Sequence, residues 1–500
     1  MTAAVNLDPS NGTPGTSGGP SRSAPLGAPD ASVRAAFDAM KRTWQERQGL
    51  SYAERMSLLA RLGDAIKAWE ERLALAVSAD FGNRSRHETA LAEIFIPIAA
   101  VKYIRKHLRG WMRAEGRETS WLFMPAKNKV IHQPLGVVGI ISPWNYPLQL
   151  ALIPIAYAVA AGNRVLLKPS ELTPKTSEVM TAMLAEVFPA DVVSVVNGGP
   201  EVGIAFSHLP FDHLFFTGST GVGRHVMRAA ADNLVPVTLE LGGKSPVLVH
   251  PEFPVDKAAE RVAVGKLFNA GQTCIAPDYV LVREDQVDAF VRAFERESTK
   301  LYPRLADNPD YTSIVSDRHY ARLNKLVEEA RTRGARVIEV NPAGETLPAA
   351  GRKIAPTLVI GAPDDAAILQ EEIFGPLLPV VTYSRLDDAI AYINARPRPL
   401  ALYYFDRDGD RIRKVLSETT SGGACVNDTL LHVGQDDLPF GGVGRSGMGS
   451  YHGPEGFYTF SHKKAVFQQS RLNTVGLLSP PFGTRIDRML DFVIGKARRR

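Results

Sequence analysis

The chain has 500 residues, 45% of them hydrophobic and 22% charged, a balance typical of a soluble globular enzyme with more than one hydrophobic core. The formal net charge is only +5 and lysines and arginines are spread along the chain, which argues against a nucleic-acid-binding protein. Two cysteines exclude a disulfide framework, no secretory leader is recognisable, and no apolar run approaches the ~20 residues of a membrane span. We therefore expect a cytoplasmic protein of two or three domains.

The first part of the chain contains a low-complexity tail and then helices. Residues 1–30 are rich in glycine, proline, serine, alanine and threonine, so they lack the apolar surface needed to fold and are predicted to be disordered. From Ala31 to about residue 110, apolar side chains recur every three or four residues, which predicts long amphipathic helices. The next segment predicts a β-hairpin, with Trp121–Met124 as its first strand and Val130–His132 as its second.

From Val137 onward, short apolar strands alternate with helices. This alternation is typical of parallel, doubly wound α/β sheets, in which each helix crosses from one strand to the next. A first series of strands is predicted at 137–141, 164–168, 192–196, 213–217 and 237–239, and a second at 246–250, 279–282, 336–340 and 357–360. The sequence therefore predicts two consecutive α/β domains with a boundary near Leu241-Gly242-Gly243, where glycines permit a hinge or a close backbone approach.

A glycine-rich turn follows the strand at 213–217. It runs Gly218-Ser219-Thr220-Gly221-Val222-Gly223, and such a turn lets backbone N–H groups and a helix N-terminus approach a pyrophosphate. The spacing differs from the Gly-x-Gly-x-x-Gly pattern, so an ordinary glycine turn is the alternative interpretation. Gly218, Ser219 and Gly223 are therefore candidate cofactor-binding residues.

A second candidate cofactor site lies at the end of the strand at 164–168. Lys168 and Glu171 stand where ligands bind in open α/β sheets. Lys168 can bind a ribose or a phosphate, and Glu171 can accept hydrogen bonds from ribose hydroxyls. Because a carboxylate here repels a 2′-phosphate, NAD is favoured over NADP, and a solvated ion pair is the alternative interpretation.

Three polar residues have the character of a nucleophilic site. Cys274 ends the motif Gly271-Gln272-Thr273-Cys274, and a cysteine nucleophile needs a base and oxyanion donors. Glu240 ends an apolar strand between two leucines, where desolvation raises a carboxyl pKa toward the range of a general base. Asn145 lies in a stiff loop with two prolines, so its amide is a candidate oxyanion donor. The alternatives are a buried packing thiol, a surface glutamate and a turn asparagine.

Six motifs, in order along the chain, resemble those of aldehyde dehydrogenases. The resemblance covers about residues 31–470. Its motifs are Pro143-Trp144-Asn145, Lys168-Pro169-Ser170-Glu171, Gly218-Ser219-Thr220, Glu240-Leu241-Gly242-Gly243-Lys244, Gly271-Gln272-Thr273-Cys274 and Glu372-Ile373-Phe374-Gly375-Pro376. The stretches Cys274–Val280 and Leu438–Gly453 resemble the class 3 branch, and His432–Leu438 is most similar to bacterial coniferyl aldehyde dehydrogenases.

The resemblance implies a role for each motif. Cys274 is expected to be the nucleophile, Glu240 the general base, and Asn145 with the Cys274 N–H the oxyanion hole. The cofactor, NAD with NADP as an alternative, is expected to contact Ser142, Trp144, Lys168, Glu171, Gly198, Gly218, Ser219, Gly223, Leu241, Glu372 and Phe374. The expected reaction oxidises an aldehyde to its carboxylic acid. No metal is expected, since no cysteine–histidine cluster has zinc-ligand spacing.

The resemblance also implies a domain organisation. Residues 31–117 and 137–240 would form the NAD-binding domain, and residues 241–450 the catalytic domain. A small β element made by 118–136 and 451–470, with a C-terminal strand near Phe457–Phe467, would join two copies as a homodimer. The tail at 471–500 would carry an amphipathic helix, which we expect to pack on the dimer, with contact to a membrane surface as the alternative.

The substrate stays open between two aldehyde classes. The resemblance favours coniferyl or other aromatic aldehydes, with medium- or long-chain aliphatic aldehydes as the alternative. An enzyme that passes the acyl group to coenzyme A is a further alternative, although such relatives lack a glutamate at the position of Glu240. A non-enzymatic scaffold is the remaining alternative, and it predicts the loss of a nucleophile that is present. The second cysteine, Cys425, is expected to be a buried packing residue.

Overall fold

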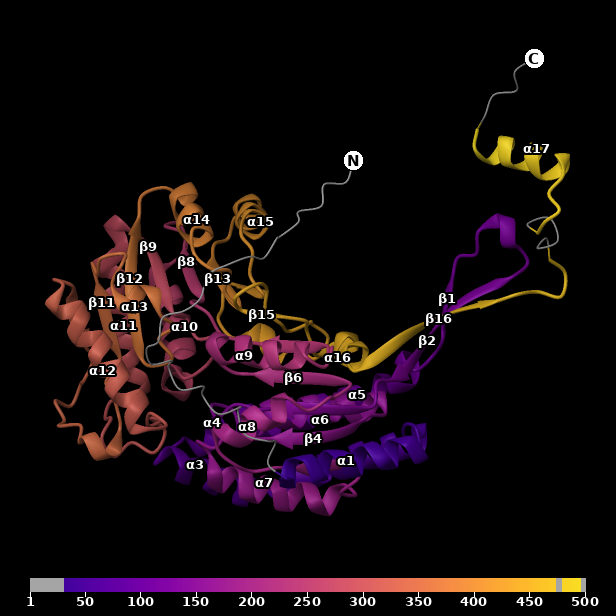
Figure 1. The fold of residues 1–500 in the computed structure, drawn as a ribbon. Coiled ribbons are helices and arrows are strands. Elements are labelled where there is room, and N and C mark those ends of the chain that lie inside the picture. Colours follow the sequence, from indigo (N-terminus) through magenta and orange to yellow (C-terminus); the bar gives the residue numbers. More distant parts are fainter. Residues whose placement is uncertain (1–30, 474–478, 496–500) are drawn as a thin grey trace, which may run out of the picture.

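The computed structural model describes residues 31–473 and 479–495, so the predicted disorder of residues 1–30 lies outside the described ranges. Two α/β bodies lie against each other, and a thin β arm extends from one of them (Figure 1). Each body is built on its own sheet, and a third, three-stranded sheet forms the arm. The predicted fold class, two α/β units and a small β element, is confirmed.

Helices from the start of the chain cover the first body. They are α1 (Ala31–Glu46), α2 (Tyr52–Ala68), α3 (Glu70–Phe81), α4 (Arg86–Thr89) and α5 (Ile96–Trp111), with a π-helical turn at Ala90–Phe95 before α5. At the start of α2, the Ser51 hydroxyl accepts from the Glu54 N–H and the Glu54 carboxylate accepts from the Ser51 N–H. This reciprocal cap satisfies amide groups that helix geometry leaves free, so the helix begins where its sequence provides the cap.

The first body contains a six-stranded sheet with the order β15-β7-β6-β3-β4-β5. Its strands are β3 (Val137–Ile141), β4 (Arg164–Lys168), β5 (Val193–Val195), β6 (His213–Thr217), β7 (Val237–Glu240) and β15 (Gly447–Met448). Its helices are α6 (Gln149–Ala161), α7 (Pro174–Val187), α8 (Pro200–Ser207) and α9 (Thr220–Ala231). All 13 residues of α6 are buried, because this helix is apolar on every face.

The second body contains a seven-stranded sheet with the order β10-β11-β12-β9-β8-β13-β14. Its strands are β8 (Pro246–Val249), β9 (Tyr279–Arg283), β10 (Arg336–Glu339), β11 (Thr357–Ile360), β12 (Leu377–Tyr383), β13 (Ala401–Phe405) and β14 (Gly423–Val426). Its helices are α10 (Val255–Leu267), α11 (Val287–Leu301), α12 (Asp317–Thr332), α13 (Ala367–Gln370), α14 (Leu386–Asn394) and α15 (Gly409–Glu418).

The sheets differ from the prediction at their edges. β10 pairs antiparallel with β11, so the predicted strand at 336–340 is not parallel to its neighbour. β15 pairs antiparallel with β7 and was not predicted. An edge strand has a neighbour on one side only, so its direction is not constrained by helical crossovers. The sequence pattern did not predict β12, β13 and β14, because prolines interrupt or precede the first two and β14 begins within the pair Gly422-Gly423.

The arm consists of β1 (Glu115–Arg117), β2 (Lys127–Pro134) and β16 (Ser461–Gln468), with β2 in the middle. The predicted first strand of the hairpin is wrong: Trp121–Phe123 forms a 3₁₀ turn, and β1 pairs with β2 instead. Trp121 is 63% exposed at this tip, so the aromatic residues that suggested a strand cover no core.

The predicted C-terminal strand also starts later than expected. Gly453–Thr459 forms helix α16, with Pro454 in its first turn, where proline suits helical geometry. Phe457 therefore lies in a helix and is buried, and the strand begins at Ser461.

Asn163 connects the arm to the first body. Its Oδ1 accepts from the N–H groups of Leu135 and Gly136 at 2.7 and 2.9 Å, and its Nδ2 donates to the carbonyls of Ala158 and Phe460 at 3.1 and 2.8 Å. The side chain is fully buried, so four hydrogen bonds satisfy all of its polar capacity. One residue thus fixes the end of β2, the end of α6 and the start of β16.

The predicted C-terminal amphipathic helix is present as α17 (Thr484–Val493). Ile486 is buried, whereas Phe492 is 79% exposed, so its apolar face is only partly covered. Across residues 31–473 and 479–495, no helix has the length and apolar character required to cross a membrane.

Candidate active site

Most of the predicted site residues meet in one pocket between the two bodies. The pocket holds about 240 Å³, and its lining residues are Pro143, Trp144, Asn145, Leu150, Thr217, Gly218, Ser219, Glu240, Leu241, Gly242, Cys274, His319, Arg322, Glu372 and Phe374. The first body contributes the carboxyl ends of β3, β6 and β7, where ligands bind in open α/β sheets. The second body contributes Cys274, residues of α12, and the segment before β12. Of the predicted residues, Ser142, Lys168, Glu171, Gly198 and Gly223 lie outside this lining.

The loop that carries Cys274 has an unusual backbone conformation. Hydrogen bonds from buried backbone and side-chain amides stabilise it. Asn269 and Ala270 adopt left-handed φ values of 52° and 50°, which cost free energy in non-glycine residues. The Asn269 N–H donates to a Glu88 carboxylate oxygen at 2.9 Å, and its Nδ2 donates to the Gln272 carbonyl at 3.1 Å. The Gln272 amide in turn donates to the Ser313 carbonyl at 3.1 Å. These contacts from distant segments keep the loop in a conformation that it would not adopt alone.

Gly271 is required at its position in this loop. It has φ of +74°, and a Cβ on it would lie 2.3 Å from the Gly375 carbonyl oxygen. The nucleophile loop and the loop after Glu372 therefore touch through their backbones, and only a glycine permits this approach.

Cys274 is a neutral thiol in the cofactor-free protein at neutral pH. Burial raises the pKa of its thiol to about 12, and the carboxyl groups of Glu372 and Glu240 raise it further in that order. A positive charge that enters the pocket would favour the thiolate, because the charged groups that act on this thiol are acidic.

Glu240 is a buried carboxyl group without a hydrogen-bond partner. It ends β7, is 3% exposed, and neither of its oxygens bonds to a described residue. Burial raises its pKa well above the ordinary value, as the flanking leucines predict. Such a group favours its protonated form and takes up or releases a proton nearer to neutral pH.

Asn145 follows β3, and hydrogen bonds hold both its backbone carbonyl and its side-chain amide. Its carbonyl accepts from Arg84 Nη1 at 3.0 Å and from Asn269 Nδ2 at 3.2 Å. Its own Nδ2 donates one hydrogen to the Gln272 carbonyl at 3.2 Å. An amide nitrogen carries two hydrogens, so the second stays available to a ligand in the pocket.

The remaining predicted residues lie at the carboxyl end of β4 and at the start of α9. Lys168 and Glu171 form an ion pair of 3.2 Å at the end of β4, which places a cation and a carboxylate side by side. Ser219 caps α9 by accepting from the Val222 N–H, so the helix N-terminus faces the pocket. A Cβ on Gly223 would lie 2.7 Å from the Leu241 side chain, so this glycine permits the close approach of helix and strand.

Glu372 lies opposite Glu240 in the pocket. A Cβ on Gly242 would lie 2.1 Å from its Oε1, so the carboxyl group occupies the space that this glycine leaves. Burial raises the pKa of Glu372 to about 8, helped by Asp278, and its Oε1 has no hydrogen-bond partner among described residues. A buried acceptor of this kind fits a ligand hydroxyl. The Lys168–Glu171 pair, the N-terminus of α9 and this acceptor therefore fit NAD.

Several residues of the site escaped the sequence analysis. His319 and Arg322 line the pocket from α12, and Arg322 donates to the backbone carbonyls of Glu372 and Ile373. Lys244 and Asp278 form a salt bridge beneath the same segment, and the Asp278 carboxylate also accepts from the Ile373 N–H at 2.8 Å. Lys244 and Asp278 lie in motifs that the resemblance identified, although it implied no role for them. No local motif marks His319 or Arg322, whose partners lie in a separate part of the chain.

Two further predictions concern the second cysteine and the absence of a metal site. Cys425 packs against the main hydrophobic core, as predicted, but it is only partly buried. Within the described ranges, no group of three histidine, cysteine or acidic side chains could hold a metal ion.

Comparison with known proteins connects this geometry to a family. The aldehyde dehydrogenase family model matches residues 23–466. The chain is 51% identical over 437 residues to a probable coniferyl aldehyde dehydrogenase of Pseudomonas aeruginosa, covering 87% of this chain and 91% of the relative. It is 49% identical over 473 residues to the coniferyl aldehyde dehydrogenase of Pseudomonas sp. strain HR199, covering 94% and 98%.

Solved structures agree with these relatives. A substrate-bound state of Staphylococcus aureus AldH has a TM-score of 0.86 at 40% identity, covering 92% of this chain and 99% of that one. An NAD+ complex of an aldehyde dehydrogenase from Bacillus cereus has a TM-score of 0.79 at 27% identity, covering 88% and 89%.

The raised pKa of Cys274 leads to a measurable pH dependence. Because that pKa is about 12, the thiolate fraction of the cofactor-free protein should keep rising about tenfold per pH unit through pH 10. Alkylation by iodoacetamide, followed by mass spectrometry in a Cys425→Ser background, measures that fraction, with circular dichroism confirming the fold at each pH. A rate that levels off near the ordinary thiol pKa of about 8.5 would contradict the burial effect.

Proposed function

Because the chain belongs to the aldehyde dehydrogenase family, whose members oxidise aldehydes with NAD, we propose that Cys274 is its nucleophile and Glu240 its general base. The observation that carries the assignment is one pocket lined by Cys274, Glu240, Asn145 and the cap of α9. No other described cysteine lines it. The protein is an NAD-dependent aldehyde dehydrogenase, and the roles of individual residues are our proposal.

In the first step the Cys274 sulfur adds to the aldehyde carbonyl carbon. The thiol proton passes to solvent, and the carbonyl oxygen becomes an oxyanion. The second hydrogen of Asn145 Nδ2 and the Cys274 N–H are the proposed donors to that oxyanion. Loss of one such donor typically costs about 2.7–4 kcal/mol of transition-state stabilisation.

Bound NAD supplies the hydride acceptor, and its oxidised nicotinamide carries a positive charge. That charge would lower the pKa of Cys274, because an opposite charge nearby favours the thiolate. We assign Glu372 and Phe374 to the nicotinamide end, where Phe374 lies 5.4 Å from the Trp144 ring. Lys168 and Glu171 are assigned to the adenosine ribose, with NADP as the alternative cofactor.

Loss of hydride leaves a thioester on Cys274, which water then hydrolyses. We propose that Glu240 takes a proton from that water as it attacks the acyl carbon, so that the carboxylic acid leaves and the thiol is restored. Neither carboxyl oxygen of Glu240 has a hydrogen-bond partner among the described residues. This supports the role, because no protein donor competes with the attacking water for the carboxylate. Transfer to coenzyme A instead of water is the alternative.

We propose coniferyl or another aromatic aldehyde as the substrate. The support is the naming of the relatives at 49–51% identity as coniferyl aldehyde dehydrogenases. An apolar cluster of Ala92, Tyr146, Leu150 and Phe268 adjoins the catalytic pocket through Leu150, which provides apolar surface beside it. A medium- or long-chain aliphatic aldehyde is the alternative.

We propose the domain organisation given by the three sheets. Residues 31–117 and 137–240 would bind NAD, residues 241–450 would carry the nucleophile, and residues 118–136 with 451–470 would form the oligomerisation element. Two short strands cross these bounds, since β1 belongs to the arm and β15 to the first sheet. A cytoplasmic location stays a prediction of the sequence.

Substitution of the two central residues separates the chemical steps. Cys274→Ala should abolish NADH formation while leaving NAD binding, measured by fluorescence titration, unchanged. Glu240→Gln should lower turnover about 10²–10⁴-fold yet keep a first burst of NADH, because hydride transfer precedes hydrolysis. Cys425→Ala is the matched control and should keep its activity. Undiminished turnover in Cys274→Ala would exclude its role as nucleophile.

A substrate panel decides between the aldehyde classes. If the pocket is built for aromatic aldehydes, kcat/KM for coniferaldehyde should exceed that for decanal by at least about tenfold, the scale on which apolar pockets discriminate. NADH absorbance is obscured by coniferaldehyde, so product acids should be quantified by chromatography. A preference for decanal would favour the aliphatic alternative.

We further propose that the arm joins two copies as a homodimer, with α17 packed on the dimer. The arm stands away from both bodies (Figure 1), and most residues of β16 are exposed, as expected of a sheet that lacks its partner. Sedimentation should therefore give about twice the 54.4 kDa of one chain. A single-chain mass would contradict this, and binding to lipid vesicles would favour the membrane alternative for α17.

A further inference from the structure

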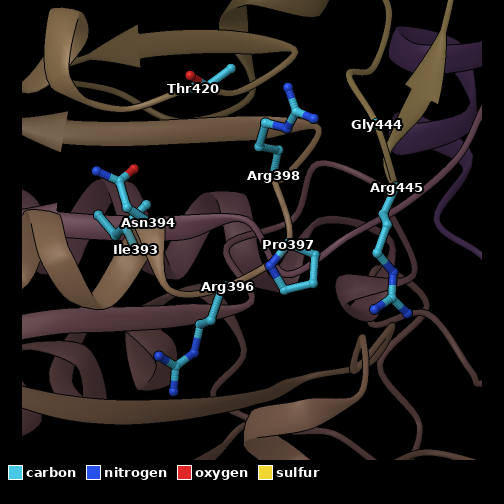
Figure 2. Close-up of a pocket in the computed structure, with 8 residues that line it drawn as sticks. All are labelled: Ile393, Asn394, Arg396, Pro397, Arg398, Thr420, Gly444 and Arg445. Carbon is cyan, nitrogen blue, oxygen red and sulfur yellow. The ribbon is translucent and has the colours of Figure 1, made fainter.

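A second, larger pocket lies outside the cofactor and substrate groove. It holds about 500 Å³, and its lining residues are Ile393, Asn394, Arg396, Pro397, Arg398, Thr420, Gly444 and Arg445. None of these residues lines the catalytic pocket. The walls come from the end of α14 and the loop after it, the turn after α15, and the loop before β15 (Figure 2).

The charged side chains that line this pocket are all positive. Three of its lining side chains are arginines, and none is an acid. Arg396 is partly neutralised, since its Nη2 lies 3.3 Å from an Asp364 carboxylate oxygen and its guanidinium lies 3.4 Å from the Tyr392 ring centroid. Arg398 and Arg445 have no hydrogen bond or ion pair to any side chain in the described ranges. Their charges are therefore available to a ligand.

Hydrogen bonds hold the walls of this pocket in place, although it contains exposed arginine side chains. The Asn394 Nδ2 donates to the Glu418 carbonyl at 2.8 Å, which joins two of the walls. Thr220 Oγ1 donates to the Arg445 carbonyl at 3.1 Å, which anchors the third wall on the first turn of α9. A ligand would thus meet walls that are already in place, which lowers the entropic cost of binding.

Gly444 brings the Arg398 head group against the third wall. Its φ is +68°, and a Cβ there would lie 3.1 Å from Arg398 Nη2. The Arg398 guanidinium therefore lies beside the residue that precedes Arg445. Figure 2 shows the three arginines around Pro397, with Arg396 and Arg445 on either side of it and Arg398 above it. Both arginines line the same pocket, and an anion bound there would offset their like charges.

We propose that this pocket binds a small anion with more than one phosphate group. Guanidinium groups bind phosphate oxygens through paired hydrogen bonds in a fixed planar geometry. The pocket offers two arginines without an ion-pair partner, a third whose charge is partly neutralised, and the Thr420 hydroxyl. This number of donors matches the several oxygens of a diphosphate better than the two oxygens of a single carboxylate. The site is separate from the catalytic chemistry, so this proposal does not depend on the roles of Cys274 or Glu240.

Calorimetric titration with inorganic pyrophosphate tests the site. The enzyme should be saturated with NAD throughout, because pyrophosphate could otherwise enter the cofactor groove at α9. We expect saturable binding that weakens as the salt concentration rises, since exposed charges are screened. The double variant Arg398→Gln, Arg445→Gln should bind at least tenfold more weakly.

A matched control separates the pocket from net charge. Arg292 is an exposed arginine on α11 with no ion pair among described residues, and Arg292→Gln should leave pyrophosphate binding unchanged. The double variant should also keep its rate of NADH formation, which shows that it is folded. No saturable binding to the wild type, or equal affinity of wild type and double variant, would overturn the proposal.

A second titration distinguishes the source of the phosphate groups. ADP carries the same diphosphate as an ester, and it is added to the NAD-saturated enzyme under the same conditions. Tighter binding of ADP than of pyrophosphate, lost in the double variant, supports a nucleotide ligand in this pocket. Tighter binding of pyrophosphate, lost in the same way, supports a free diphosphate. ADP binding that the double variant retains would assign it to another site and counts against the pocket.

Discussion

A fully buried ion pair between Arg84 and Glu93 holds the loop on which the proposed oxyanion donor sits. The two side chains have no exposed surface and approach within 2.6 Å. Arg84 also donates to the Asn145 carbonyl, and Glu93 accepts from the Leu148 N–H at 2.7 Å. Removing one partner of such a pair typically costs about 3–5 kcal/mol, because the other charge stays buried alone. The geometry of Asn145 therefore depends on charges that never touch the substrate.

The catalytic pocket concentrates features that are unfavourable for stability. Two carboxyl groups, Glu240 and Glu372, are buried there without full hydrogen bonding, and Phe374 adopts a left-handed φ of 56°. Proteins tolerate such costs where function requires them and offset them elsewhere. Here the offset is the apolar interior around α6, every residue of which is buried. The same burial raises both carboxyl pKa values, so the cost in stability is also the source of the acid–base character.

The sequence predicted the parts of the fold and site that depend on local pattern. Alternating apolar segments located the main strands and helices, and the leucines around Glu240 predicted its raised pKa. Prediction from the sequence failed where contacts between distant segments determine the structure. The aromatic tip at Trp121 has strand-like composition but no sheet neighbour, and β15 is only two residues long. The supports of the site, such as Arg84 and Arg322, could not be found because their partners lie far away along the chain.

The pairing of β15 with β7 also bears on the order in which the protein forms during synthesis. Gly447 lies opposite Glu240 in the sheet, yet about 200 residues separate them along the chain. At roughly 5–20 residues per second, the ribosome needs on the order of 10–40 s to make that stretch. Until then, the first sheet has an open edge beside its most buried carboxyl group. The nucleotide-binding half of the nascent chain therefore stays incomplete while the other half is being made. The residues from Gly447 onward then close both the sheet, through β15, and the arm, through β16.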